Sequence, residues 1–103
     1  MRVQLELCVV PIGVGTSLGD YIAACQEVLE AAGLETRLHA YGTNIEGEWD
    51  TVFAAVRECH ERLHAMGAPR IFTSIKVGTR TDRVQGLDDK VASVQQRLTP
   101  RAG

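Results

Sequence analysis

Two one-sided helical stripes constrain the fold of this chain more than any other feature. Apolar residues recur three or four positions apart from Leu18 to Ala32, which predicts a helix with a single apolar face. A second stripe of the same kind runs from Trp49 to Met66. Because each helix has only one apolar face to bury, both helices are expected to cover the same face of one sheet.

Local signals indicate where these helices begin and end. Ser17 followed by Asp20 resembles a capping box, so the first helix is predicted to begin at this serine. Gly33 fits the position just after the end of the first helix, and Gly67 ends the second.

Four segments alternate between apolar and polar residues, which predicts strands. They span residues 3–10, 34–41, 43–48 and 70–80, and Pro11 is expected to stop the first. A short C-terminal helix is predicted from the spacing of Leu87, Val91, Val94 and Leu98. The resulting order indicates an α+β fold, a ferredoxin-like βαββαβ antiparallel sheet with helices on one face and an extra C-terminal helix.

Length and charge narrow the class of protein. The 103 residues fit one domain at 1–98 with a flexible tail at 99–103. The net charge is −2 and no block of Lys and Arg stands out, so nucleic acid is not an expected partner. The apolar run from Leu7 to Ile12 is too short to span a bilayer, and there is no signal-peptide pattern. Three cysteines in apolar contexts favour reduced thiols, so a cytoplasmic protein with no membrane partner is expected.

The most polar stretch is Tyr41–Asp50, which holds three carboxylates, an amide and a hydroxyl beside two glycines. Either a solvated hairpin or a ligand-lining strand accounts for it. Polar side chains on a central strand are unfavourable unless they are paired or hydrated. Thr43, Glu46 and Glu48 are therefore expected to meet a ligand or a neighbouring subunit.

Other polar groups give weaker signals. The loop from Gly13 to Ser17 leads into a helix and could receive a polar ligand atom, but it lacks the glycines and lysine of nucleotide motifs. His60 and His64 have helical spacing, yet no second cluster completes a zinc site, so no metal is expected. Cys8 has no evident base beside it, so no catalytic residue is expected.

Three motifs together resemble the thiamine-binding protein family. They are Pro11-Ile12-Gly13 with Ser17, Tyr41–Glu48 with Asp50, and Thr73–Lys76 with Arg80 and Asp82. The resemblance covers nearly the whole chain. It implies a homo-oligomer of ferredoxin-like subunits that pair edge to edge, commonly as a dimer of dimers. It also implies non-catalytic cytoplasmic binding of thiamine or its hydroxymethylpyrimidine part near subunit junctions, with no cofactor.

On this resemblance and the chemistry of the ligand, the expected ligand-binding residues are Thr16, Ser17, Tyr41, Thr43, Asn44, Glu46, Glu48 and Ser74. Two alternatives stay open. One is a structural or regulatory oligomer without a small-molecule ligand, in which Glu46 and Glu48 pair with Lys76 or Arg80 across subunits. The other is a hydrolase acting on thiamine derivatives.

Overall fold

The structure, a computed structural model, describes residues 1–98, so the tail predicted at 99–103 lies outside the described residues. Its elements are β1 (Arg2–Ile12), α1 (Gly19–Ala31), β2 (Glu35–His39), β3 (Gly42–Glu48), α2 (Trp49–Ala65), β4 (Arg70–Gly78) and α3 (Leu87–Leu98). This is the predicted order of elements, and the ferredoxin-like α+β fold is confirmed.

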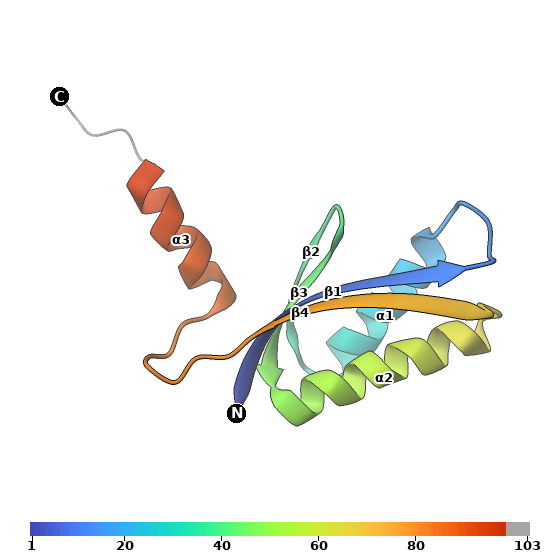
Figure 1. Ribbon diagram of the computed structural model, residues 1–103, viewed down its shortest axis with the longest axis horizontal. Helices are drawn as coiled ribbons and strands as arrows, with labels where there is room; N and C mark the ends of the chain where they lie inside the picture. The colour runs from blue at the N-terminus through green and yellow to red at the C-terminus, as the bar shows by residue number, and fades with distance from the viewer. Residues whose placement is uncertain (99–103) are drawn as a thin grey trace.

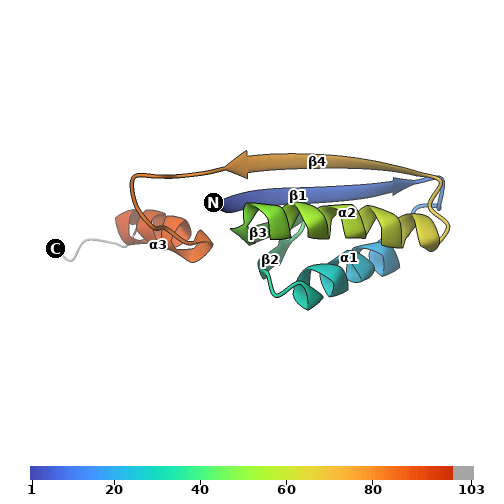
Figure 2. The same cartoon turned by 90° about the horizontal axis from the view of Figure 1, so that it is seen from below.

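The four strands form one antiparallel sheet in the order β2-β3-β1-β4. Helices α1 and α2 lie side by side on one face of this sheet, as predicted, whereas α3 projects beyond its end (Figures 1 and 2). Along β1 the odd-numbered residues from Val3 to Pro11 are buried, so the even-numbered ones lie on the other face. We call this second face the open face.

An aliphatic core lies between the sheet and the two helices. Leu29 of α1, Ile45 of β3 and Leu63 of α2 are each 0% exposed. Burying a side chain of this size contributes about 1.5–3 kcal/mol. The core thus fixes β3 and β1 in the middle of the sheet, with α1 against their helix-facing side chains.

The start of α1 differs from the prediction. Its N-cap is Leu18 and carries no side-chain hydrogen bond, so the capping box predicted at Ser17 is wrong. Gly13 and Gly15 adopt φ values of +86° and +89° in the preceding loop. Glycine adopts such left-handed φ values without steric cost, so these two residues allow the loop to turn before α1.

The end of β1 also differs from the prediction, because the strand continues through Pro11 to Ile12. Its pairing with β3 stops at Leu7↔Thr43, and beyond that point β4 is its one strand neighbour in the described chain. Proline lacks an N–H, which is tolerated where a strand has a free edge. Residues 8–12 of β1 therefore extend beyond β3 as an overhanging end.

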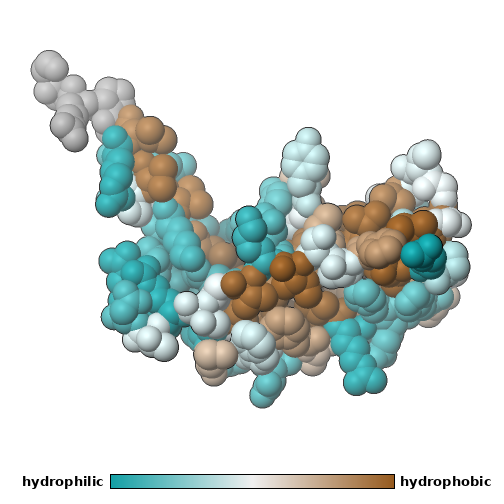
Figure 3. Space-filling view, in the orientation of Figure 1, coloured by the Kyte–Doolittle hydropathy of each residue, from teal (hydrophilic) through white to brown (hydrophobic). Residues whose placement is uncertain are grey.

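The C-terminal helix forms where its apolar spacing predicts, but it buries no side chain. Val91, Val94 and Leu98 are 55%, 55% and 73% exposed. Figure 3 shows apolar side chains along the arm that α3 makes outside the body of the molecule. The radius of gyration is accordingly 16.0 Å, against about 13 Å for a compact domain of 100 residues.

Candidate functional site

A cavity of about 390 Å³ opens where β1 extends beyond the end of its pairing with β3. Its walls come from the overhanging end of β1, from α1, and from the turn that joins β2 to β3. We call it the hairpin cavity. It is lined by Leu7–Val10, by Leu18, Ile22, Cys25 and Leu29, and by Leu38–Thr43. Most of these side chains are apolar, which is usual for sites that bind small organic molecules.

A few polar groups stand in this apolar lining. The hydroxyl of Thr43 is buried and donates a 3.0 Å hydrogen bond to Oε1 of Gln26 on α1. Nε2 of His39 lies 3.4 Å from Oε2 of Glu6 on the open face, a contact that becomes an ion pair when the imidazole is protonated. Tyr41 at the turn is 87% exposed, so one face of its ring is free for a ligand.

Gly42 allows the turn to close against β1. A Cβ at this position would lie 2.7 Å from the carbonyl oxygen of Leu7 and 3.5 Å from Cε1 of His39. The carbonyl oxygen of Leu7 therefore occupies the space that a side chain at residue 42 would need. The imidazole of His39 lies at ordinary contact distance from this position, close to Glu6, and lines the hairpin cavity.

The structure brings only part of the predicted ligand-binding set together. Tyr41 and Thr43 line the hairpin cavity, and Leu18 at its rim directly follows the exposed Thr16 and Ser17. Asn44 and Ser74 lie on the open face, opposite Glu6 and Cys8 of β1 respectively.

The two predicted carboxylates lie elsewhere and have partners within the described chain. Glu48 accepts a 3.0 Å hydrogen bond from the amino group of Met1. Glu46 is 7% exposed, lies 3.4 Å from Arg2, and accepts a 3.3 Å hydrogen bond from the backbone N–H of Leu87. Central polar residues are thus paired, as their position on a central strand requires.

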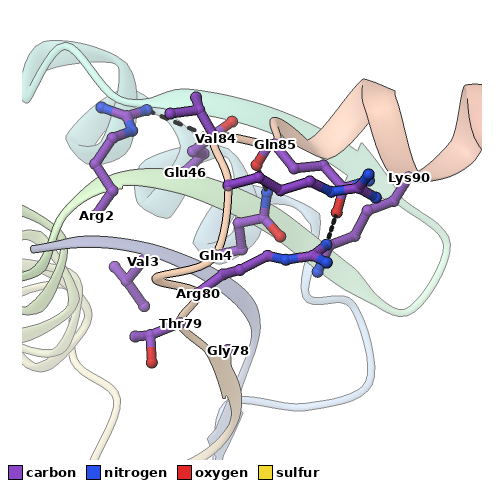
Figure 4. A pocket seen from close by; sticks show the side chains of 11 residues that line it. Arg2, Val3, Gln4, Glu46, Gly78, Thr79, Arg80, Val84, Gln85 and Lys90 are labelled. Atoms are coloured by element: carbon purple, nitrogen blue, oxygen red, sulfur yellow. Dashed lines mark hydrogen bonds and ion pairs between the residues drawn. The ribbon is translucent and has the colours of Figure 1, made fainter.

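Glu46 belongs to a second cavity, of about 300 Å³, which we call the basic pocket. Its floor is formed by the N-terminal end of β1 and by Gly78 at the end of β4, and its roof by the segment 79–85 with the first turn of α3 (Figure 4). It is lined by four cationic side chains, Arg2, Arg80, Arg83 and Lys90, and one acidic side chain, Glu46. Sequence reasoning missed this pocket.

The remaining candidates form ordinary internal contacts. His60 shares a 2.6 Å hydrogen bond with the hydroxyl of Thr73, and Nδ1 of His64 donates one of 2.8 Å to the carbonyl of Ala68. Within residues 1–98 no group of three or more His, Cys, Asp or Glu side chains is placed to hold a metal ion. Cys8, Cys25 and Cys59 are free thiols.

The two buried thiols influence each other across the α1–α2 contact. Cys59 contacts the carbonyl oxygen of Cys25 at 3.8 Å from its Sγ. A hydrogen bond with Cys25 and burial raise the pKa of Cys59 far above its ordinary value, whereas the same hydrogen bond lowers the pKa of Cys25. Both side chains are 5% exposed or less, so this pair belongs to the core.

Sheet order and helix placement define a ferredoxin-like domain with an apolar cavity at one end of its sheet. Residues 5–95 match the family described as thiamine-binding protein. The chain belongs to this family, as the sequence motifs indicated.

Several relatives match over four fifths or more of their length. The UPF0045 protein sll0230 of Synechocystis sp. is 64% identical over 98 residues, covering 95% of this chain and 81% of that protein. The UPF0045 protein ECM15 of Eremothecium gossypii is 36% identical over 100 residues, covering 96% and 95%. A UPF0045 protein of Methanothermobacter thermautotrophicus is 36% identical over 98 residues, covering 93% and 99%.

Solved structures share the fold. The crystal structure of the hypothetical protein MJ1052 from Methanocaldococcus jannaschii has a TM-score of 0.85 at 26% identity, covering 92% of this chain and 97% of that one. A Thermotoga maritima structure described as a candidate thiamine biosynthesis or salvage protein has a TM-score of 0.78 at 20% identity, covering 91% and 99%. Neither comparison identifies contact residues in this chain. None of the helices in the described part is long and apolar enough to span a bilayer.

Proposed function

We propose that this protein binds thiamine or its hydroxymethylpyrimidine part in the hairpin cavity, without carrying out chemistry on it. Family membership supports the ligand class, and one structural observation supports the place. The hairpin cavity joins apolar walls to the free edge of β1. Backbone donors and acceptors along such an edge suit the aminopyrimidine ring, whose own edge carries both donors and acceptors.

The charges around the two cavities favour the same assignment. Thiamine carries a positive thiazolium ring, which four cationic side chains in the basic pocket would repel. In the hairpin cavity the ring would instead meet the exposed ring of Tyr41, and the carboxylate of Glu6 lies 3.4 Å from the cavity-lining His39. An aromatic face attracts a cation by about 0.5–2 kcal/mol. Thr43 supplies the buried hydroxyl of the predicted set.

Calorimetry on the folded protein tests this proposal. We expect one thiamine or hydroxymethylpyrimidine molecule to bind per chain. Leu18→Trp should fill the cavity mouth and weaken binding of both ligands at least tenfold, because the half-buried Leu18 lines it. Val94→Trp places the same ring on α3 and should change neither affinity. Absence of heat with both ligands at millimolar concentration would sink the proposal.

We also propose that the protein acts in the cytoplasm as a homo-oligomer, a dimer of dimers. Strands β2 and β4 form the two edges of the sheet, and edges of this kind commonly pair between subunits. Light scattering at micromolar concentration should give a mass above that of one chain. A monomeric mass would contradict the assembly without touching the ligand proposal.

A structural or regulatory oligomer without a small-molecule ligand is the second candidate. The observation that favours it is the unburied apolar stripe of α3. Val91→Glu with Val94→Glu should then dissociate the oligomer. The second candidate replaces the first if the parent protein gives no heat of binding with either ligand and this pair of substitutions dissociates the oligomer.

A further inference from the structure

We infer that the basic pocket is a second, separate binding site that takes the phosphate or diphosphate group of a small molecule. It does not depend on the thiamine proposal. The first observation is charge: four cations and one carboxylate line the pocket, a formal +3, in a chain whose net charge is −2. A concave, positively charged surface attracts anions and concentrates them locally.

The single acidic group in the pocket is already neutralised. Glu46 is paired with Arg2 at 3.4 Å and accepts the backbone N–H of Leu87. The carboxylate of Asp89, outside the lining, accepts the backbone N–H of Gly86 at 2.8 Å. The start of α3 is thus satisfied by carboxylates, and the anion site consists of side chains instead.

The cations divide into two pairs with different tasks. Arg2 pairs with Glu46, and Arg80 donates one hydrogen bond to Gln85 (Figure 4). Arg80 also donates two hydrogen bonds to Asp82, which lies outside the lining. Arg83 and Lys90 line the same pocket and have no ion pair within residues 1–98. Two cations are therefore fixed by the fold, and two are available to a ligand.

The basic pocket is also a formed cavity with a floor and a roof, and not a patch of open surface. The roof is tied to the floor by a 2.5 Å hydrogen bond from Nε2 of Gln4 to the carbonyl of Gln85, and Arg2, Arg80 and Lys90 all line the pocket. Its volume of about 300 Å³ is at the lower end for small-molecule sites. Two separated free cations match a diphosphate better than a single carboxylate, since each charged oxygen group can meet its own donor.

Titration calorimetry of the full chain with inorganic pyrophosphate at low salt tests the inference. We expect binding that weakens as salt is raised. Arg83→Gln and Lys90→Gln should each lower the pyrophosphate affinity about tenfold, because each removes one charged hydrogen-bond donor to the anion. Arg57→Gln is the matched control, since it removes the same charge from the exposed Arg57–Glu61 pair on α2.

Two results would overturn the inference. One is the absence of any heat of binding with pyrophosphate at millimolar concentration, and the other is an equal loss of pyrophosphate affinity in Arg57→Gln and Lys90→Gln. Unphosphorylated thiamine should bind Lys90→Gln as it binds the parent, and a parallel loss would make this pocket the thiamine site instead. Thiamine diphosphate separates the two sources of the anion. If Lys90→Gln weakens the binding of thiamine diphosphate, the pocket takes the phosphate of an organic molecule. If Lys90→Gln abolishes pyrophosphate binding but leaves the affinity for thiamine diphosphate unchanged, the pocket takes the free anion.

Discussion

The hydroxyl of Thr43 on β3 and the side-chain amide of Gln26 on α1 are joined by a 3.0 Å hydrogen bond. This contact ties a central strand to a helix at the wall of the hairpin cavity. It satisfies the one hydroxyl that the polar stretch Tyr41–Asp50 places on the helix-facing side of the sheet.

Thr43→Val should lower the free energy of unfolding by about 1 kcal/mol, the usual net value of such a hydrogen bond. Chemical denaturation followed by circular dichroism measures it. Thr36→Val on β2 is the control, because Thr36 faces the same side of the sheet. Equal losses in the two variants would mean that the bond to Gln26 adds nothing to stability.

Gly42→Ala should destabilise the protein by about 1–3 kcal/mol, as overpacking of a close contact does. Its new Cβ would lie 2.7 Å from a backbone oxygen of Leu7, which cannot rotate away. Gly19→Ala, where nothing lies within 4 Å of the new Cβ, should be neutral or slightly stabilising. Thermal unfolding of both variants compares them, and an unchanged midpoint in Gly42→Ala would refute the close approach.

One thiol of three should react with a thiol reagent in the native protein at pH 8. Cys8 is half-buried, whereas Cys25 and Cys59 are buried. The hydrogen bond with Cys25 and burial raise the pKa of Cys59, which keeps it in the unreactive thiol form. All three thiols should react in the denatured protein. Cys8→Ser should abolish the rapid reaction of the native protein. Rapid reaction of two thiols in the native state would contradict this packing.

The carboxyl of Asp82 should titrate at about pH 2. Hydrogen bonds from Arg80 lower the pKa of Asp82 from 3.8 to about 2. Because the folded-state value is the lower one, the stabilisation is complete above about pH 4 and is lost as the pH falls through 2. Carbon-detected NMR of the side-chain carboxyl follows the change. Arg80→Gln should return the midpoint toward 3.8, and a parent midpoint already near 3.8 would disprove the pairing.

The regular elements were predictable because their side-chain periodicities are local. The stripes of α1 and α2 and the alternation of β1 needed only a short window of sequence, and the burial of Leu29 and Ile45 follows from them. The capping box predicted at Ser17 was wrong, because the N-cap is Leu18 and no side chain caps the helix. The preceding loop, with its two left-handed glycines, leaves no periodic signal that would fix the first helical residue.

The sites were harder to predict because they depend on register between distant strands. Tyr41 and Thr43 could be singled out within one polar stretch. Arg2 meets Glu46 only because β1 and β3 pair Arg2 with Glu48 and Gln4 with Glu46. The fourth strand was predicted to include residues 79 and 80 of the roof of the basic pocket, but β4 ends at Gly78. Residues 81–85 have neither helical nor strand periodicity, so the sequence did not show that the cations of this segment lie over the strand end.

The first turn of helix α3 is held to the rest of the molecule by a hydrogen bond from the N–H of Leu87 to Glu46 and by the pair of Asp88 with Arg37 at 2.8 Å. Its twelve residues are close to the shortest length at which a peptide helix persists alone in water. In a lone chain the outer turns therefore follow a helix–coil equilibrium of their own, and their amide protons exchange long before those of the core. A partner that covers the apolar stripe of α3 must offset the conformational entropy that is lost when these turns become ordered. Contact with a partner is therefore expected to appear as an ordering of the outer turns of α3, without a change in the neighbouring sheet.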